Sequence, residues 1–366
     1  MGGGRLTGIL ELPARIEALA TAERARVDRL LDVRPVVGST DPPVALEPWL
    51  EETFGSADAV RNQRMLRITN RATLESTIFA PLRGRRPIDG PVATRDLRAE
   101  IASTLGDPFC DPLNGTPSDT FGRVRGARMV TGANAALADA HHAVLVFDEH
   151  DPLAFDADLV TDLFATGRAW AERAQDEDPR ATAYLLVWNC LWRAGGSIVH
   201  GHAQVLLGSA HHARVERFRR DGELHRQAHG TDLASDLVDV HRDLGLAVDR
   251  GGLTILSHLV PVKEREVLVV ARPGTDERDP AFAAAVAHAL LTYRDRLGAR
   301  SFNLALWRPP LTADGAPPEG WERFPTMVRI VDRGDPFSRP SDIGAMELYG
   351  TPIVGSDPYD VAAALR

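Results

Sequence analysis

Short apolar segments alternate with a helical stripe in the middle of the chain. Residues 143–147 are apolar and partly β-branched, which predicts a strand, and residues 184–188 and 198–207 predict two more. Between the first two strands, apolar residues from Leu159 to Ala174 recur near helical spacing. The pattern predicts a strand–helix–strand unit.

The same order of elements recurs further along the chain. Residues 266–270 predict a strand, residues 282–297 a helix with an apolar stripe, and residues 301–307 another strand. This repetition predicts two related halves, although such units are also common in unrelated α/β proteins. Before both halves, residues 18–32 predict a helix that ends by Pro35.

Composition is typical of a globular protein with about two domains. Of the 366 residues, 44% are hydrophobic and 25% are charged. No apolar run approaches the roughly 20 residues that a membrane helix needs, and no signal-peptide pattern follows the glycine-rich start. With only two cysteines, we expect a cytoplasmic protein without a disulfide scaffold and without a membrane partner, and we interpret Cys190 as a core thiol.

The net charge of -9 argues against nucleic acid as a partner, because an acidic protein gains nothing from phosphate backbones. Lys263 is the only lysine among 42 basic residues, so arginine supplies the remaining positive charge. Arginine binds phosphate in a bidentate manner whatever the net charge. A small anionic substrate therefore remains compatible with the composition.

The segment His200-Gly-His-Ala-Gln204 is the most informative part of the sequence. On a strand, residues two apart face the same side, so both histidines and Gln204 would share one face. Polar side chains on an otherwise apolar strand are costly without partners. A hydrogen-bonded or exposed trio is the alternative, but the upstream turn Gly195-Gly196 and Ser197 favour a functional site.

This residue set suits attack on phosphorus. A neutral imidazole is available near neutral pH, and a hydrogen bond to one ring nitrogen leaves the other free to attack. The covalent nucleotidyl-histidine would divide one transfer into two steps. Gln204, Ser197 and the backbone amides near Gly195 and Gly196 can donate hydrogen bonds as negative charge builds up.

Residues 188–204 resemble the active-site segment of galactose-1-phosphate uridylyltransferases, a branch of the histidine triad superfamily. That segment has an Asn, then a Gly and a Ser, then His-Pro-His-Gly-Gln. The resemblance implies that His202 is the catalytic nucleophile and that His200 is a zinc ligand. The matching positions are Asn189, Gly195, Ser197, His200, His202 and Gln204.

The resemblance extends upstream and implies further site residues. Cys110 and His150 match zinc ligands, whereas Asp107 stands where the family has a cysteine; a metal-free site is the alternative. Asn134 matches a residue that lies against the nucleotide. The arginine-rich turn containing Arg83 and Arg86 matches one near the base and phosphates.

The resemblance also implies the architecture. We expect an α+β fold of two histidine-triad-like halves, each an antiparallel sheet flanked by helices. Residues 1–62 would be an extension, residues 63–215 the half with the active site, and residues 216–366 a second half that shapes the acceptor pocket. A homodimer with structural zinc is expected.

The expected activity is transfer of a nucleoside monophosphate between a nucleoside-diphosphate sugar and a sugar 1-phosphate. A phosphorylase or hydrolase of a nucleoside-diphosphate sugar or dinucleoside polyphosphate is the alternative, with phosphate or water as acceptor. A nucleotide-binding protein without turnover is a third hypothesis.

Three further departures from the family pattern bear on the acceptor and on the site. Gly201 replaces the proline between the histidines, and residues 324–327 lack the histidines of the family's second metal site. Met346 and Glu347 leave the register of a hexose-contacting glutamate open. We therefore do not expect galactose 1-phosphate as the acceptor. Arg308 is a candidate contact for a phosphate, with a structural salt bridge as the alternative.

The pair His141-His142 either lines the site or ends a solvated loop.

Overall fold

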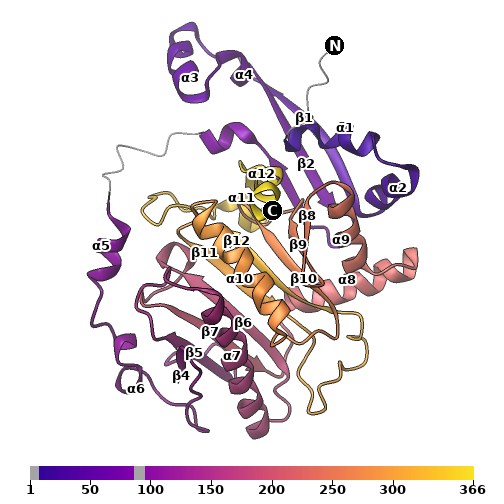
Figure 1. Cartoon of the computed structure of the whole chain (residues 1–366). Helices are drawn as coiled ribbons and strands as arrows, with labels where there is room; N and C mark the ends of the chain where they lie inside the picture. Colours follow the sequence, from indigo (N-terminus) through magenta and orange to yellow (C-terminus); the bar gives the residue numbers. More distant parts are fainter. Residues whose placement is uncertain (1–7, 86–94) are drawn as a thin grey trace.

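Nine antiparallel strands form the large sheet at the centre of the molecule (Figure 1). The computed structural model describes residues 8–85 and 95–366. In spatial order the strands are β4 (Met129–Ala133), β5 (His141–Phe147), β7 (His202–Gly208), β6 (Ala183–Cys190), β11 (Phe302–Trp307), β12 (Pro325–Asp332), β10 (Val267–Pro273), β9 (Leu253–Ser257) and β8 (Ala247–Arg250).

The two predicted halves join edge to edge within this single sheet. Strands β6 and β11 pair antiparallel at the junction, with Asn189 opposite Asn303. On one side of the junction the order is β6, β7, β5, and on the other it is β11, β12, β10. Corresponding strands of the two halves therefore lie at equal distances on opposite sides of the junction, so the strand order of one half is the reverse of the other. The expectation of a separate sheet in each half is corrected: the strands of both form one sheet.

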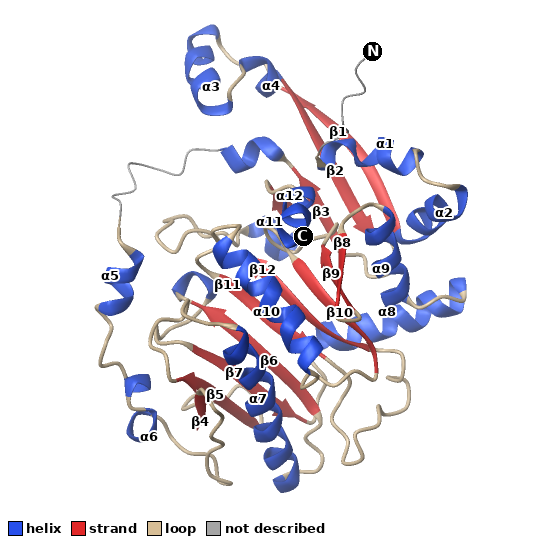
Figure 2. Ribbon diagram, viewed as in Figure 1, coloured by secondary structure: helices blue, strands red, loops and turns tan. Residues whose placement is uncertain are grey.

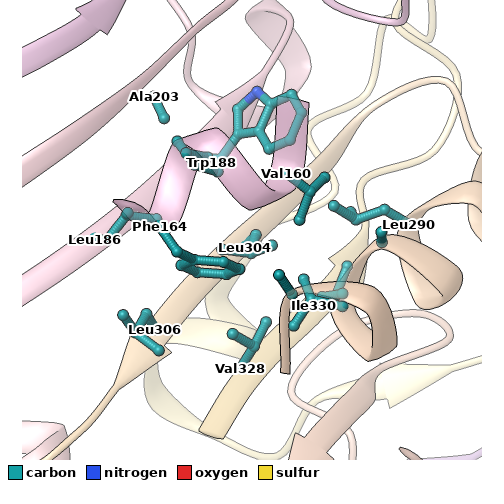
Figure 3. Close-up of a cluster of buried hydrophobic side chains, with 14 of the residues drawn as sticks. Val160, Phe164, Leu186, Trp188, Ala203, Leu290, Leu304, Leu306, Val328 and Ile330 are labelled. Atoms are coloured by element: carbon teal, nitrogen blue, oxygen red, sulfur yellow. The ribbon is translucent and has the colours of Figure 1, made fainter. Parts of the chain in front are cut away.

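Two long helices cover one face of the sheet (Figure 2). They are α7 (Ala157–Glu177) and α10 (Pro280–Asp295), the helices that the apolar stripes predict. Alternate residues of the strands point toward them and form the main core, because successive strand side chains face opposite sides. Figure 3 shows part of this core, where Trp188 of β6 and Phe164 of α7 are both fully buried.

A second, four-stranded sheet combines both ends of the chain. Its order is β1 (Leu31–Ser39), β2 (Asn62–Asn70), β3 (Ser76–Phe79) and β13 (Ile353–Val354), and β13 runs parallel to β3. Strands β1 and β2 extend away from the large sheet and end in α3 (Glu47–Phe54) and α4 (Ala57–Arg61) (Figure 1). The helices α1 (Leu12–Glu17), α2 (Thr21–Leu30) and α9 (Leu233–Asp243) pack near this sheet around a smaller apolar core.

The remaining helices are α5 (Leu97–Ala102), α6 (Pro112–Gly115), α8 (Ala213–His229), α11 (Ala345–Tyr349) and α12 (Pro358–Leu365). Within the described ranges, none of the helices is long and apolar enough to cross a membrane. The predicted strands and the helix near residues 18–32 are present with boundaries shifted by a few residues. Cys190 is fully buried, as its interpretation as a core thiol requires.

Candidate active site

The face of the sheet opposite α7 and α10 carries the polar side chains of the predicted site. On β7, Ala203, Val205 and Leu207 belong to the core under the helices. His202 and Gln204 therefore point to the opposite face. Strand pairing sets Val146 and Val144 of β5 beside these two residues. The predicted alternation thus holds for His202 and Gln204.

His200 lies outside strand β7, so the expected single strand with three polar residues holds only for His202 and Gln204, although the rings of His200 and His202 both lie beside Phe109. Strand β7 begins at His202, and His200 lies in the bend before it. The difference arises because the backbone of Gly201 bonds on both sides to the β5 end: its oxygen accepts from Phe147 N at 2.9 Å, and its nitrogen donates to His150 O at 3.0 Å. In the bend, the His200 ring contacts Cys110 and His150.

His202 has one ring nitrogen committed and one available. Its Nδ1 lies 2.8 Å from the backbone oxygen of His200. A carbonyl only accepts, so Nδ1 carries the proton and Nε2 keeps its lone pair. The residue is 6% exposed, and burial lowers the pKa of His202 below its usual range, against the opposite effect of the hydrogen bond to His200. The neutral tautomer is the one a nucleophile requires.

Four potential metal ligands converge beside His202. Asp107, Cys110, His150 and His200 each offer one ligand atom, and these atoms all lie within 4.8 Å of one another. The Cys110 Sγ atom is 3.4 Å from His150 Nδ1 and 3.6 Å from His200 Nδ1. The two Nδ1 atoms are 3.1 Å apart. The ligand set that the resemblance implies is thus brought together in space.

The chemistry of these four residues fits a zinc ion. The Nε2 atom of His200 donates to Phe147 O at 2.8 Å, and that of His150 lies 3.0 Å from Ile101 O. Both Nδ1 lone pairs therefore face each other and the thiol, an arrangement that repels unless a cation lies between them. Asp107 Oδ2 is buried without a hydrogen-bond partner. Tetrahedral zinc sets neighbouring ligand atoms roughly 3.3 to 3.8 Å apart, close to the observed spacing.

Gly201 is fixed by close packing where the related family has proline. A Cβ atom at this position would lie 2.8 Å from Phe147 Cδ2 and 3.0 Å from Glu149 O. The first contact is shorter than real Cβ contacts and the second is tight, so a larger residue would require Phe147 or the backbone to shift. The packing and the two backbone bonds supply the rigidity that the proline gives the related motif.

The amide of Gln204 is oriented by a histidine on the next strand. His142 Nδ1 accepts from Ala138 N at 3.2 Å, so its Nε2 carries the proton and donates to Gln204 Oε1 at 3.0 Å. The Nε2 group of Gln204 is then the end available for an acceptor such as a phosphate oxygen. His142 is 5% exposed, which resolves the two readings of His141-His142: His142 lines the site. Asn134 Nδ2 lies 3.3 Å from the same Nε2 atom but, because that atom carries the proton, does not donate a hydrogen bond to it.

The turn before β7 contains the remaining motif residues. Gly195 adopts a φ of 95°, and a Cβ atom at Gly196 would lie 2.9 Å from Asn189 O. Ser197 is exposed in the bend that follows. Asn189 Oδ1 accepts from Asn303 Nδ2 at 2.7 Å, a partner in the second half that the motif did not predict. In the sequence, the only indication of this partner is that Asn303 occupies the position in the second half that Asn189 occupies in the first.

Of the three arginines predicted as phosphate contacts, the structure describes Arg83 and Arg308. Arg83 is exposed on the short helix Pro81–Arg85 at the end of β3, on the smaller sheet, and Arg86 lies outside the described residues. Arg308 forms an ion pair with Glu277 at 2.6 Å; Glu277 is fully buried and the Arg308 side chain is 11% exposed. Arg308 therefore forms a structural salt bridge, which was the alternative to a phosphate contact.

A cavity of about 520 Å³ lies on the same sheet face, over the second half. Asn303, Trp307 and Val331 of β11 and β12 contribute to its lining. Since Asn303 pairs with Asn189, and strands are about 4.8 Å apart, the cavity begins roughly 10 Å from His202. The charged residues that line it are Glu75, Arg214, Arg217, Asp221, Lys263, Arg333 and Glu347.

No protein-family model and no curated protein matches the chain, but solved structures share its fold. An ADP-glucose phosphorylase from Arabidopsis thaliana, determined with bound ADP-glucose, is 15% identical, with 81% of this chain and 97% of that chain covered at a TM-score of 0.62. A GalT-like protein from Arabidopsis thaliana is 16% identical, with 71% and 91% covered at a TM-score of 0.57. A uridylyltransferase is 16% identical, with 81% and 96% covered at a TM-score of 0.55.

These identities are low, so the likeness establishes the fold and leaves the reaction open. It confirms, at the level of fold, the resemblance on which the sequence interpretation rests. The chain therefore has the α+β fold shared by GalT-like proteins, uridylyltransferase and ADP-glucose phosphorylase, and it is a divergent example of that fold.

Proposed function

We propose that the protein is a nucleotidylyltransferase that moves a nucleoside monophosphate through a covalent intermediate on His202. The observation that carries the proposal is geometric: Nδ1 of the buried His202 ring donates to His200 O, which leaves the lone pair of Nε2 for attack. Gln204, on the same strand face, and Ser197 are the donors that we propose for the phosphoryl oxygens. The resemblance of residues 188–204 to uridylyltransferases supports the same chemistry.

In the first step, the lone pair of His202 Nε2 attacks the α-phosphorus of a nucleoside-diphosphate sugar. A nitrogen–phosphorus bond forms, the bond from phosphorus to the bridging oxygen breaks, and the sugar phosphate leaves with the electron pair. Gln204 Nε2 and the hydroxyl of Ser197 donate to the non-bridging oxygens as their charge increases. In the second step, an acceptor oxygen attacks phosphorus and the nitrogen–phosphorus bond breaks.

Zinc held by Cys110, His150 and His200, with Asp107 as fourth ligand, would fix the bend that precedes His202. Four protein ligands leave no open position, which is the pattern of structural zinc. The carbonyl of His200 that orients His202 belongs to one of these ligands. We therefore propose a structural role for the metal and no role in binding substrate.

The second half is proposed to shape the acceptor pocket, through the cavity lined by Asn303 and Trp307. The reversed strand order across the β6–β11 junction supports an origin of the two halves by duplication. Four basic residues line the cavity, and Lys263 donates to the backbone oxygen of Asp342 rather than to a carboxylate. An anionic acceptor, either a sugar phosphate or inorganic phosphate, suits this lining.

Phosphorolysis of a nucleoside-diphosphate sugar is the second candidate, because the ADP-glucose phosphorylase structure aligns over 97% of its length. It uses the same intermediate with phosphate as the acceptor. The experiment that tests both is intact-mass spectrometry after mixing with UDP-glucose, ADP-glucose or a GDP sugar. We expect one of them to add one nucleotidyl group. Acceptors added singly to that adduct then separate transferase from phosphorylase, and absence of an adduct with all three would contradict the proposal.

A further inference from the structure

A chain of side-chain hydrogen bonds joins the second half of the sheet to Asn189. Asp342 binds Arg333 through both carboxylate oxygens, at 2.6 Å to Nε and 2.9 Å to Nη2. Arg333 Nη1 donates to Asn303 Oδ1 at 2.5 Å. Asn303 Nδ2 donates in turn to Asn189 Oδ1 at 2.7 Å and to Ala194 O at 2.8 Å.

The order of donors and acceptors in this chain has only one solution. A guanidinium group can donate but cannot accept, so the oxygen of the Asn303 amide must face Arg333. Its nitrogen then faces Asn189, whose oxygen must accept. The Nδ2 group of Asn189 is therefore the end that remains for a ligand, and among the described residues no protein partner for it is observed.

Asn189 lies level with His202 on the neighbouring strand. The β6–β7 pairing ends at Val187 and Gln204, and extending its register by two residues would place Asn189 opposite His202, on the face away from the helices. Adjacent strands are about 4.8 Å apart, so the Asn189 amide reaches a group attached to the His202 ring. The bond from Asn303 to Ala194 O also holds the start of the turn with Gly195 and Gly196.

We infer that Asn303 and Arg333 are positioning residues that turn the Asn189 amide so that its nitrogen donates to the phosphoryl group on His202. The inference rests on the proposed function. Both residues also line the 520 Å³ cavity, so the same network connects the acceptor pocket to the transfer site. Neither residue belongs to the active-site segment.

The variant Asn303→Asp tests the inference, because it keeps the side-chain shape and an acceptor for Arg333 but removes the donor. The Asn189 amide must then rotate to donate to the new carboxylate, and it presents its oxygen to the phosphoryl group. We expect kcat for nucleotidylation to fall about 100-fold, as for the loss of one oxyanion donor, with KM changed less than about threefold. Asn62→Asp, the same change in the exposed first residue of β2, is the control.

A double-mutant cycle separates positioning from general structural damage. In the Asn189→Ala background, Asn303→Asp is expected to cause no further loss, because the group through which it acts is gone. Arg333→Gln, which releases the orientation of Asn303, is expected to lower kcat and to lose its effect in the same background, and Arg333→Lys should retain more activity than Arg333→Gln. If Asn303→Asp does not fold, as judged by its melting temperature, the Arg333 series decides the outcome.

These experiments distinguish a failure of this inference from a failure of the proposed function. A wild-type adduct together with losses that vanish in Asn189→Ala supports the inference. A wild-type adduct with losses that simply multiply in the double variants would overturn the inference and leave the proposed function intact. Absence of any wild-type adduct would overturn the proposed function and this inference with it.

Discussion

His202 Nδ1 donates to the backbone oxygen of His200 at 2.8 Å, so the first histidine of the motif orients the second through its main chain. The ring of His200 meanwhile faces Cys110 and His150. One short segment thereby connects the candidate metal cluster to the candidate nucleophile. A substitution in the metal cluster should therefore alter the orientation of the His202 ring through this hydrogen bond.

The first prediction concerns the metal. Protein purified without chelator should contain one zinc per chain, because three lone-pair donors and the orphaned Asp107 oxygen converge at one point. Cys110→Ala should remove the metal and lower the melting temperature by about 5 °C or more. Elemental analysis and a melting curve are the measurements. Cys190→Ala leaves the cluster unchanged and is the control for metal content; full activity without any zinc would refute the structural role.

The second prediction concerns Gln204 and the histidine that orients it. Gln204→Ala should slow nucleotidylation by about 100- to 1,000-fold while substrate binding changes little, because the lost donor matters most in the transition state. His142→Phe removes the bond to Gln204 Oε1 and should lower kcat in the same direction by a smaller factor. Ser197→Ala tests the other donor. Single-turnover rates at varied substrate separate kcat from KM; a rise in KM alone would mean ground-state binding.

The third prediction concerns Gly201. Gly201→Pro, which restores the proline of the related family, should destabilise the fold by about 2–4 kcal/mol. The ring would meet Phe147 and Glu149 and would remove the donor to His150 O. Denaturant unfolding measures the change. Gly222→Ala, in α8, where an added Cβ would make only an ordinary contact with Leu233 at 3.9 Å, is the control and should be neutral or slightly stabilising. Equal stability of Gly201→Pro and wild type would show that the packing argument fails.

The fourth prediction concerns the acceptor. Galactose 1-phosphate should discharge the nucleotidyl-enzyme more slowly than another sugar phosphate or inorganic phosphate does. Lys263→Met should raise the KM of the preferred anionic acceptor about tenfold, because it removes a cation from the cavity. Discharge by water should not change and serves as the internal control. Fast, saturable discharge by galactose 1-phosphate ahead of all other acceptors would return the protein to the family's namesake reaction.

Much of the fold and the centre of the site follow from local patterns. The apolar stripes predict α7 and α10, and strand alternation predicts that His202 and Gln204 share a face. The strand was predicted to include His200, but β7 begins only at His202, because Gly201 forms backbone hydrogen bonds with Phe147 and His150 in a distant segment. The role of Arg308 likewise depends on its ion pair with Glu277, because only folding brings these two residues close together.

The residues that orient the site were the least predictable part. His142 and Asn303 act through single hydrogen bonds to motif residues on neighbouring strands. Such partners depend on strand order, and the reversed order across the β6–β11 junction does not follow from the apolar pattern of either half. The single continuous sheet was missed for the same reason.

The most direct test is to locate the adduct by tandem mass spectrometry of peptides from protein mixed with a nucleoside-diphosphate sugar. His202 is predicted to carry the nucleotidyl group, as an acid-labile phosphoramidate. His202→Ala should fold, bind nucleotide and form no adduct, with turnover reduced at least about 1,000-fold, whereas His229→Ala, on the exposed end of α8, should behave as wild type. An adduct on another residue, or activity of His202→Ala within a few-fold of wild type, would contradict nucleophilic catalysis by His202.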